Sequence, residues 1–289
     1  MILTNSQIQS WLSCRRCYKF EYIDLLKPVE ESPALRIGSA VHYGLHYHYL
    51  FETSDIAVTQ FYKQVVASCT VLDIVGIETE QQLVSAMLNG YQNYYADEKL
   101  TVLASEQTIK TQINRDIWFA GKIDMIAEID GGKWLFEHKT AGSIENGYFE
   151  KLAIDPQITG YLYLATQKYP DVRGAVYNVL RKPSIRQKQN ETIEEFHQRM
   201  KQDYLDRPEF YFQRRDVVRN DRELAEFPDY VKNITDEIRY HRNFFPRNPG
   251  QCNLYGSCAF RSLCVEYSPE LASTYAKKTS LHEELDAEF

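Results

Sequence analysis

The 289-residue sequence contains no run of eighteen or more apolar residues, so it encodes no candidate membrane-spanning helix. It also lacks internal repeats and low-complexity segments, and its composition, 44% hydrophobic and 25% charged, excludes the disordered and collagen-like classes. Residues 1–19 lack the apolar core and cleavage site of a secretory signal. We therefore expect a folded protein of the cytoplasm, where disulfides are rare.

Positive charge is also in short supply, because 33 Lys and Arg residues stand against 40 Asp and Glu, giving a formal charge of -7. This balance repels a polyanion and, taken alone, argues against a nucleic-acid partner. Phosphate contacts depend on local clusters, however, so a short basic segment can still bind DNA. Two segments are candidates, one with Arg15, Arg16 and Lys19 and the other with Arg214, Arg215, Arg219 and Arg222.

The length fits one large domain, and we take residues 1–289 as a single unit. Apolar residues at helical spacing predict helices within residues 4–23 (running into a basic turn at 15–17), 38–49 and 81–98. Alternating residues between turn signals predict an antiparallel meander of strands at 102–106, 108–113, 117–129 and 133–138. The later pattern predicts a helix at 155–169, strands at 175–180 and 211–218, and a helix at 221–245.

The most informative segment surrounds the Gly131-Gly132 pair. If these glycines are the centre of a tight hairpin, the antiparallel register sets Asp124 opposite Lys139. Because side chains alternate along a strand, Glu137 then points to the same face as both of them. Two carboxylates and an ammonium group are thereby gathered within a few ångströms.

Buried carboxylates of this kind are costly unless a cation neutralises them, and oxygen ligands suit Mg²⁺ or Mn²⁺. A lysine beside such a metal can orient or deprotonate a water and stabilise negative charge on a phosphate. These are the parts of metal-dependent phosphodiester hydrolysis. The alternative is a solvent-exposed strand face carrying a weak Asp–Lys pair, and the pairing alone favours that alternative.

A family resemblance shifts the balance towards the metal. Gly-Lys-Ile-Asp ending at Asp124, followed after the hairpin by Glu-His-Lys ending at Lys139, resembles the core motif of the PD-(D/E)xK nuclease superfamily in its RecB-like branch. Gly-Ser-Ala-Val-His ending at His42 is similar to the "G-x-x-x-H" segment of that branch, whose histidine is a metal ligand. Glu106 stands where the branch often has a strand glutamate before the motif.

Residues 155–161 are similar to the "Q-x-x-x-Y" motif of the same branch, and the spacing puts Gln157 and Tyr161 on one helix face. The resemblance implies that His42, Asp124 and Glu137 bind Mg²⁺ or Mn²⁺. It further implies that Lys139 positions the attacking water and stabilises the transition state, while Gln157 and Tyr161 support the site. The implied catalytic set is Lys139, Asp124, Glu137, Gln157 and Tyr161.

The implied fold class is α/β, or α+β, with a restriction-endonuclease-like core of a mixed, mainly antiparallel sheet flanked by helices. Residues 101–245 would form this nuclease core and residues 38–100 a helical part. Residues 1–37 and 246–268 would be terminal segments joined by an iron–sulfur cluster. Residues 269–289 form a polar tail with no assigned role.

Six cysteines suggest a metal site in a reducing compartment, since three of them lie within thirteen residues near the C-terminus. Four thiolates can hold an iron–sulfur cluster or a zinc ion. Resemblance to AddB-type and CRISPR-associated RecB-like proteins favours a [4Fe–4S] cluster over zinc and leaves Cys17 without a ligand role. Cys69 is expected to be a core residue. The implied ligands are Cys14, Cys252, Cys258 and Cys264.

The resemblance thus predicts a metal-dependent DNA nuclease, with exonuclease action on single-stranded or free-ended DNA. Phage-type exonucleases of the branch, recombination, repair and CRISPR spacer acquisition supply possible settings and protein partners. One alternative is a non-catalytic DNA-binding subunit that uses the nuclease fold. Another is a zinc-stapled hydrolase of other phosphoesters.

Overall fold

The computed structural model describes residues 1–68, 74–241, 243–254 and 256–286, so the predicted core residue Cys69 lies outside the described residues. A six-stranded mixed sheet forms its centre, with strand order β1-β4-β5-β6-β7 and with β3 paired to β4. The predicted α/β class, a mainly antiparallel sheet flanked by helices, is confirmed. The strands are β1 (Ile2–Leu3), β3 (Thr101–Asn114), β4 (Ile117–Ile129), β5 (Gly132–Ala141), β6 (Val172–Arg181) and β7 (Phe212–Val217).

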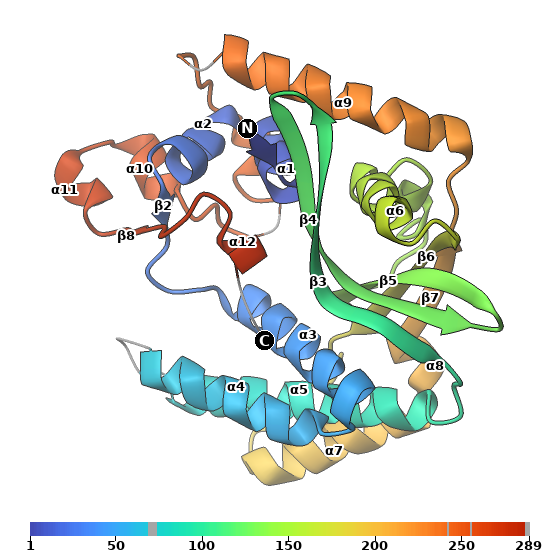
Figure 1. Cartoon of the computed structure of the whole chain (residues 1–289). Coiled ribbons are helices and arrows are strands. Elements are labelled where there is room, and N and C mark those ends of the chain that lie inside the picture. The colour runs from blue at the N-terminus through green and yellow to red at the C-terminus, as the bar shows by residue number, and fades with distance from the viewer. Residues whose placement is uncertain (69–73, 242, 255, 287–289) are drawn as a thin grey trace.

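Helices cover both faces of the sheet, as Figure 1 shows. On one face, α6 (Pro156–Lys168) and α9 (Asp221–Tyr240) share a core cluster that includes Leu135 of β5. On the other face, α3 (Pro33–Phe51) packs against the sheet, where Phe136 of β5 belongs to a second cluster. Strand β6 is buried along most of its length because it lies inside the sheet with helices on both sides.

A separate helical layer packs against α3. It consists of α4 (Ser54–Ser68), α5 (Ile74–Tyr94) and α7 (Ile193–Asp206). The sequence predicted α5 in part but missed α4 and α7, whose apolar residues were not recognised as helical stripes. Within the described residues, no helix is both long enough and apolar enough to cross a bilayer.

The hairpin between β4 and β5 differs from the predicted one. Ile129 pairs with Gly132, so the two central turn residues are Asp130 and Gly131, with φ angles of +50° and +68°. Positive φ at both positions is the signature of a type I′ turn, and an Asp-Gly pair is one of its preferred sequences. The predicted register, which placed Gly131 and Gly132 at the centre, is therefore wrong by two residues.

The first and last segments of the chain fold together. Helix α1 (Asn5–Ser13) lies within the predicted helical range 4–23 and is capped by Thr4, whereas the predicted basic turn is helix α2 (Arg15–Tyr18). Backbone and side-chain hydrogen bonds link this region to the chain around Asn248, whose amide donates to the Ser13 carbonyl at 2.8 Å. The remaining short helical turns are η1 (Lys19–Ile23), η2 (Glu150–Ala153), α8 (Pro208–Tyr211), η3 (Pro249–Gln251), α10 (Arg261–Val265) and α11 (Pro269–Ala272).

The C-terminal tail is part of this terminal unit. Strand β8 (Ala276–Lys277) pairs antiparallel with β2 (Leu26–Lys27), and α12 (Glu283–Asp286) lies beside the N-terminus. Lys27 Nζ donates to both carboxylate oxygens of Glu283 at 2.9 Å. Contacts such as Asn248–Ser13 and Cys17–Cys258 join residues 1–37 to residues 246–268, and the polar tail, which had no assigned role, packs against the N-terminal segment.

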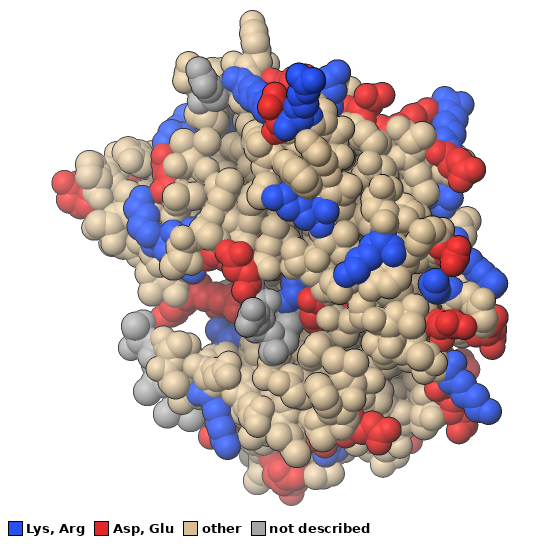
Figure 2. Space-filling view, in the orientation of Figure 1, with Lys and Arg blue, Asp and Glu red and all other residues tan. Residues whose placement is uncertain are grey.

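Charged side chains of both signs are interspersed over the face shown in Figure 2, without one continuous basic surface. This distribution agrees with the net charge of -7. Attraction of a polyanion on this face must therefore depend on individual cationic side chains.

Candidate active site

The side chains of His42, Glu106 and Asp124 converge between helix α3 and the sheet. They come from α3, β3 and β4, and one ligand atom of each lies within 4.8 Å of the others. His42 Nδ1 is 3.3 Å from Asp124 Oδ1 and 3.5 Å from Glu106 Oε1. An imidazole nitrogen and two carboxylates suit a divalent cation. The three residues form a candidate metal centre.

Glu106 reaches this centre from an unusual backbone conformation. Its φ angle is +51°, in the left-handed region that costs a non-glycine residue about 1–3 kcal/mol. Both of its neighbours in β3 still pair with β4, so the deviation is confined to this residue. Strain of this kind persists only where the surrounding structure over-determines it, and it concentrates at functional sites. The backbone thus supports a functional role for Glu106.

Asp124 lies where β4 and β5 separate. The last pair in their register is Met125–Phe136, after which β5 continues beside β6. The Asp124 Oδ2 accepts a 2.7 Å hydrogen bond from the backbone N–H of His138. Oδ2 of Asp124 therefore holds β5 beyond the point where it separates from β4, and Oδ1 faces His42.

Glu137 and Lys139 form an ion pair beside Asp124. Lys139 Nζ is 2.5 Å from Glu137 Oε1, whereas Glu137 Oε2 is buried and has no hydrogen-bond partner among the described residues. Burial raises the pKa of Glu137 to about 7, against the lowering effect of Lys139. The unpartnered oxygen is the kind of group that a metal ion would satisfy. Two of the three predicted ligands, His42 and Asp124, lie together with Glu106. The third predicted ligand, Glu137, lies beside Asp124 and outside this group of three.

The electrostatics of these side chains favour a cation at this centre. Although burial lowers it, the Asp124 and Glu106 carboxylates raise the pKa of His42 to about 10. Burial opposes ionisation of Asp124, but the His42 imidazolium holds the pKa of that carboxyl below its usual range. A divalent cation held by these side chains would compete with the proton on His42, so its binding would be coupled to proton release.

Helix α6 carries the two residues of the predicted Gln–Tyr motif. Asp155 caps the helix by accepting from the backbone N–H groups of Gln157 and Ile158. Tyr161, one turn later, lies close enough to Glu137 that burial and this carboxylate raise its pKa above the ordinary value, opposed in part by Gln157. Tyr161 therefore lies beside the Glu137–Lys139 ion pair, and Gln157 contacts Tyr161 from one turn earlier on α6.

Gly121, the first residue of the core motif, makes room for Tyr161. A Cβ at this position would lie 2.7 Å from Tyr161 Cε1 and 3.0 Å from Leu164 Cδ1. We expect Gly121→Ala to lower the free energy of unfolding by about 1–3 kcal/mol, because the helix must move away. Urea denaturation measures this change. Gly142→Ala is the matched control, since a Cβ there meets nothing within 4 Å, and equal losses in both variants would contradict the argument.

A family model for the PD-(D/E)XK nuclease superfamily matches residues 2–265, which include every residue of the candidate metal centre. The chain belongs to the PD-(D/E)XK nuclease superfamily. No curated protein sequence matches it significantly. Among solved structures, a candidate exonuclease from Eubacterium rectale is similar, with 12% identity, a TM-score of 0.47, and coverage of 88% of this chain and 85% of its own. The structure of SSO0001 is similar with 14% identity and a TM-score of 0.35, over 86% and 93% of the two chains.

In this member of the superfamily, a buried polar network supports the motif from the opposite side of β5. Asn178 Nδ2 lies 2.8 Å from His138 Nδ1, and Asn178 Oδ1 accepts from Arg214 Nε at 3.1 Å. Because the arginine can only donate, the amide nitrogen faces His138, whose Nδ1 must accept. Burial lowers the pKa of His138 to about 3, so this imidazole stays neutral. The network fixes the residue whose backbone N–H holds Asp124.

Two arginines of the predicted DNA-contacting segment have structural roles in this nuclease fold. Arg214 pairs with Glu98 and donates to the Tyr91 hydroxyl, and its side chain is only 16% exposed. Arg219 donates to Thr159 Oγ1 and to backbone carbonyls. The prediction that these two arginines contact phosphates is wrong, because their guanidinium groups are already used within the protein.

The other predicted basic residues are more accessible. Arg15 pairs with Glu237 and Lys19 with Asp24, both partly exposed. Arg222 is largely exposed on α9, and Arg215 is exposed on β7. Arg215 also lines a pocket.

The five described cysteines of the nuclease, Cys14, Cys17, Cys252, Cys258 and Cys264, lie in the terminal unit and form no disulfide with one another. The Sγ atoms of Cys17 and Cys258 are 3.5 Å apart, and Cys264 packs in the same cluster with Phe20 and Phe260. The Cys258 contact, burial and nearby Cys14 all raise the pKa of Cys17. Cys17, which the resemblance left without a role, thus touches a predicted ligand, and both N-terminal cysteines lie at the candidate cluster site.

Proposed function

We propose that this protein is a metal-dependent deoxyribonuclease that digests single-stranded or free-ended DNA as an exonuclease. The observation that carries this proposal is the convergence of His42, Glu106 and Asp124 beside the Glu137–Lys139 ion pair. Membership of the nuclease superfamily supports hydrolysis of phosphodiesters. Recombination, repair or spacer acquisition in the cytoplasm, alone or with protein partners, are the settings that the resemblance favours.

Mg²⁺ or Mn²⁺ would be held by His42, Asp124 and Glu137, with Glu106 as a further ligand. A metal bound there polarises a phosphoryl oxygen and lowers the pKa of a bound water. Burial opposes the charge on Lys139, but Glu137 and Asp124 raise its pKa, so the side chain stays protonated at neutral pH. Lys139 therefore acts as a hydrogen-bond donor that orients the water and stabilises charge on the phosphate. Tyr161 and Gln157 hold this pair in place from α6.

A nuclease assay on end-labelled single- and double-stranded DNA with Mg²⁺ or Mn²⁺ tests the proposal. We expect wild-type protein to release short products from a free end of single-stranded DNA, and Asp124→Asn to release none above background. Binding without cleavage under both metals would instead identify a non-catalytic DNA-binding subunit. Cleavage of circular single strands at a rate equal to linear ones would exclude exonuclease action.

Metal binding has a readout that does not depend on activity. A ligand that binds only the folded state stabilises it by RT ln(1 + [L]/Kd), about 2.7 kcal/mol at a hundredfold excess over Kd. We expect Mn²⁺ to raise the melting temperature of wild-type protein but not that of Asp124→Asn. Asp171→Asn is the control, because this carboxylate is 80% exposed and far from the centre in sequence. An equal rise in all three proteins would show that Mn²⁺ binds elsewhere.

We further propose that the terminal cysteines hold a [4Fe–4S] cluster, with Cys14, Cys252, Cys258 and Cys264 as ligands. The Sγ atoms of Cys17 and Cys258 are 3.5 Å apart, so cysteines from the two ends of the chain meet at one place. The resemblance to AddB-type and CRISPR-associated RecB-like proteins favours a [4Fe–4S] cluster over zinc in these thiolates.

Iron and sulfide analysis of anaerobically purified protein separates the cluster from zinc. We expect about four iron and four sulfide per chain in wild type. Cys14→Ser should lose the iron while Cys17→Ser retains it. The reverse result would reassign the N-terminal ligand to Cys17, and zinc in place of iron would overturn the cluster.

A further inference from the structure

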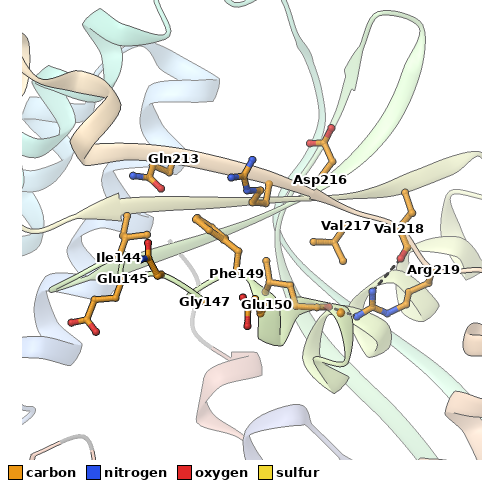
Figure 3. A pocket seen from close by; sticks show the side chains of 14 residues that line it. Ile144, Glu145, Gly147, Phe149, Glu150, Gln213, Asp216, Val217, Val218 and Arg219 are labelled. Atoms are coloured by element: carbon orange, nitrogen blue, oxygen red, sulfur yellow. Dashed lines mark hydrogen bonds between the residues drawn. The ribbon is translucent and has the colours of Figure 1, made fainter.

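A pocket of about 760 Å³ lies between the β5–α6 connection and the edge strand β7 (Figure 3). Its walls are formed by residues 144–153 on one side and by β7 and the residues that follow it on the other. A volume of this size is within the range of small-molecule sites. None of the residues assigned to the metal centre or to the cysteine cluster lines it.

The pocket is aligned with the candidate active site across the sheet. Glu137 pairs with Tyr177 in the register of β5 and β6, and Tyr177 pairs with Arg215 in that of β6 and β7. Directly paired residues point to the same face of a sheet. With neighbouring strands about 4.8 Å apart, Arg215 is roughly 10 Å from Glu137 along this row. At ~3.4 Å per stacked nucleotide, a single strand spans that distance in about three nucleotides.

The lining combines groups that recognise a nucleotide. The Arg215 guanidinium lies 5.4 Å from the Phe149 ring centroid, and Phe149 meets Tyr177 edge-to-face at 6.4 Å. An aromatic ring can stack a base of any sequence, and a guanidinium can bind its phosphate. Gln213, two residues before Arg215 on the same face of β7, adds an amide that can donate and accept.

Three acidic residues, Glu145, Glu150 and Asp216, also line the pocket and restrict what it can hold. Asp216 alternates to the opposite face of β7, and Figure 3 shows the side chains of Asp216 and Glu145 pointing away from Phe149. The Glu150 carboxylate lies over Gly147, where it would repel a second phosphate. Arg219 is already bonded to Thr159 and Leu152. Among the described residues that line the pocket, Arg215 is therefore the cation available to bind a phosphate, and one such cation suits one nucleotide.

We propose that this pocket binds one nucleotide of the substrate strand, a few nucleotides from the scissile phosphate. The base stacks on Phe149 and the phosphate binds Arg215. This inference rests on the proposed nuclease function and adds a substrate-binding subsite to it. The subsite favours single-stranded DNA, because a base can stack on Phe149 only when it is unpaired.

The test compares a long and a short substrate in Arg215→Ala and Phe149→Ala. A labelled single-stranded oligonucleotide reaches the pocket, whereas bis(p-nitrophenyl) phosphate occupies only the metal centre. We expect the ratio of kcat/KM for the oligonucleotide to kcat/KM for the ester to fall about tenfold in each variant, mainly through KM. A ratio equal to that of wild type in both variants would overturn the proposal.

Two exposed residues of the same types outside the pocket provide controls. Arg239→Ala on α9 and Phe244→Ala, at a residue that is 65% exposed, should keep the wild-type ratio, and an equal fall in them would also overturn the proposal. If wild type cleaves neither substrate, the proposed function fails and binding alone decides the inference. In Ca²⁺, fluorescence anisotropy should then show weaker oligonucleotide binding by Arg215→Ala than by Arg239→Ala, and equal binding refutes the subsite.

Discussion

Replacing Lys139 with alanine is expected to slow DNA cleavage by about 10²- to 10³-fold, the usual effect of removing a donor to developing charge. Lys139 is paired with Glu137, which together with Asp124 keeps the ammonium protonated, so its contribution is a positive charge and hydrogen bonds. The positive charge and the hydrogen bonds both stabilise the transition state more than they stabilise bound DNA. The loss should therefore appear in kcat, with KM for the oligonucleotide changed little.

Lys133→Ala is the matched control for this measurement. Lys133 lies on the same strand, but its side chain pairs with the exposed Asp171 at the hairpin end of β5. We expect its kcat to match that of wild type. A Lys139→Ala protein that retained full metal-dependent cleavage would refute the assigned role, provided that its Mn²⁺-induced rise in melting temperature showed an intact metal centre.

Arg214→Met is expected to cost about 3–5 kcal/mol of unfolding free energy, the usual effect of removing one partner of a buried ion pair. The substitution leaves the Glu98 carboxylate without its cation and removes donors to Asn178 and Tyr91. The hydrogen-bond network that contacts His138 then lacks the arginine that donates to Asn178. Urea denaturation followed by circular dichroism measures the change.

A double variant shows whether the unpaired charge is the cause. Arg214→Met combined with Glu98→Gln should recover part of the loss, because the orphaned carboxylate is replaced by a neutral amide. Arg222→Met is the control, since its side chain is 86% exposed and pairs with Glu226 along α9, and it should change stability by less than about 0.5 kcal/mol. Equal losses for the two arginines would show that burial of Arg214 contributes nothing.

The sequence predicted the grouping of Asp124 and Glu137 despite an incorrect turn. The register was wrong by two residues, and a shift of two leaves every side chain on its original face because the side-chain period of a strand is two. A shift of one residue would have separated them. Strand β4, predicted at 117–129, was placed correctly because its apolar run is bounded by clear turn signals on both sides.

Other features depend on tertiary contacts that local patterns do not carry. The conformation that directs Glu106 to the metal centre is a single positive φ angle within a regular strand, and no residue type in its neighbourhood signals it. Likewise, the sequence shows that Arg214 is charged but not that it is buried against Glu98. Helix α7 has a clear capping box at Thr192, a signal that would have located its start.

The pairing of β2 with β8 has a consequence for the order of folding during synthesis. Lys27 and Glu283, which join these ends, are 256 positions apart, so the terminal unit cannot close until nearly the whole chain has left the ribosome. Contacts between residues so far apart in sequence cost loop-closure entropy, and they therefore form late in folding. The sheet and its helices can assemble first as the chain emerges, with β1 and α1 joined to them. Strand β2 and the two N-terminal cysteines must wait for the C-terminal segment that pairs and packs with them.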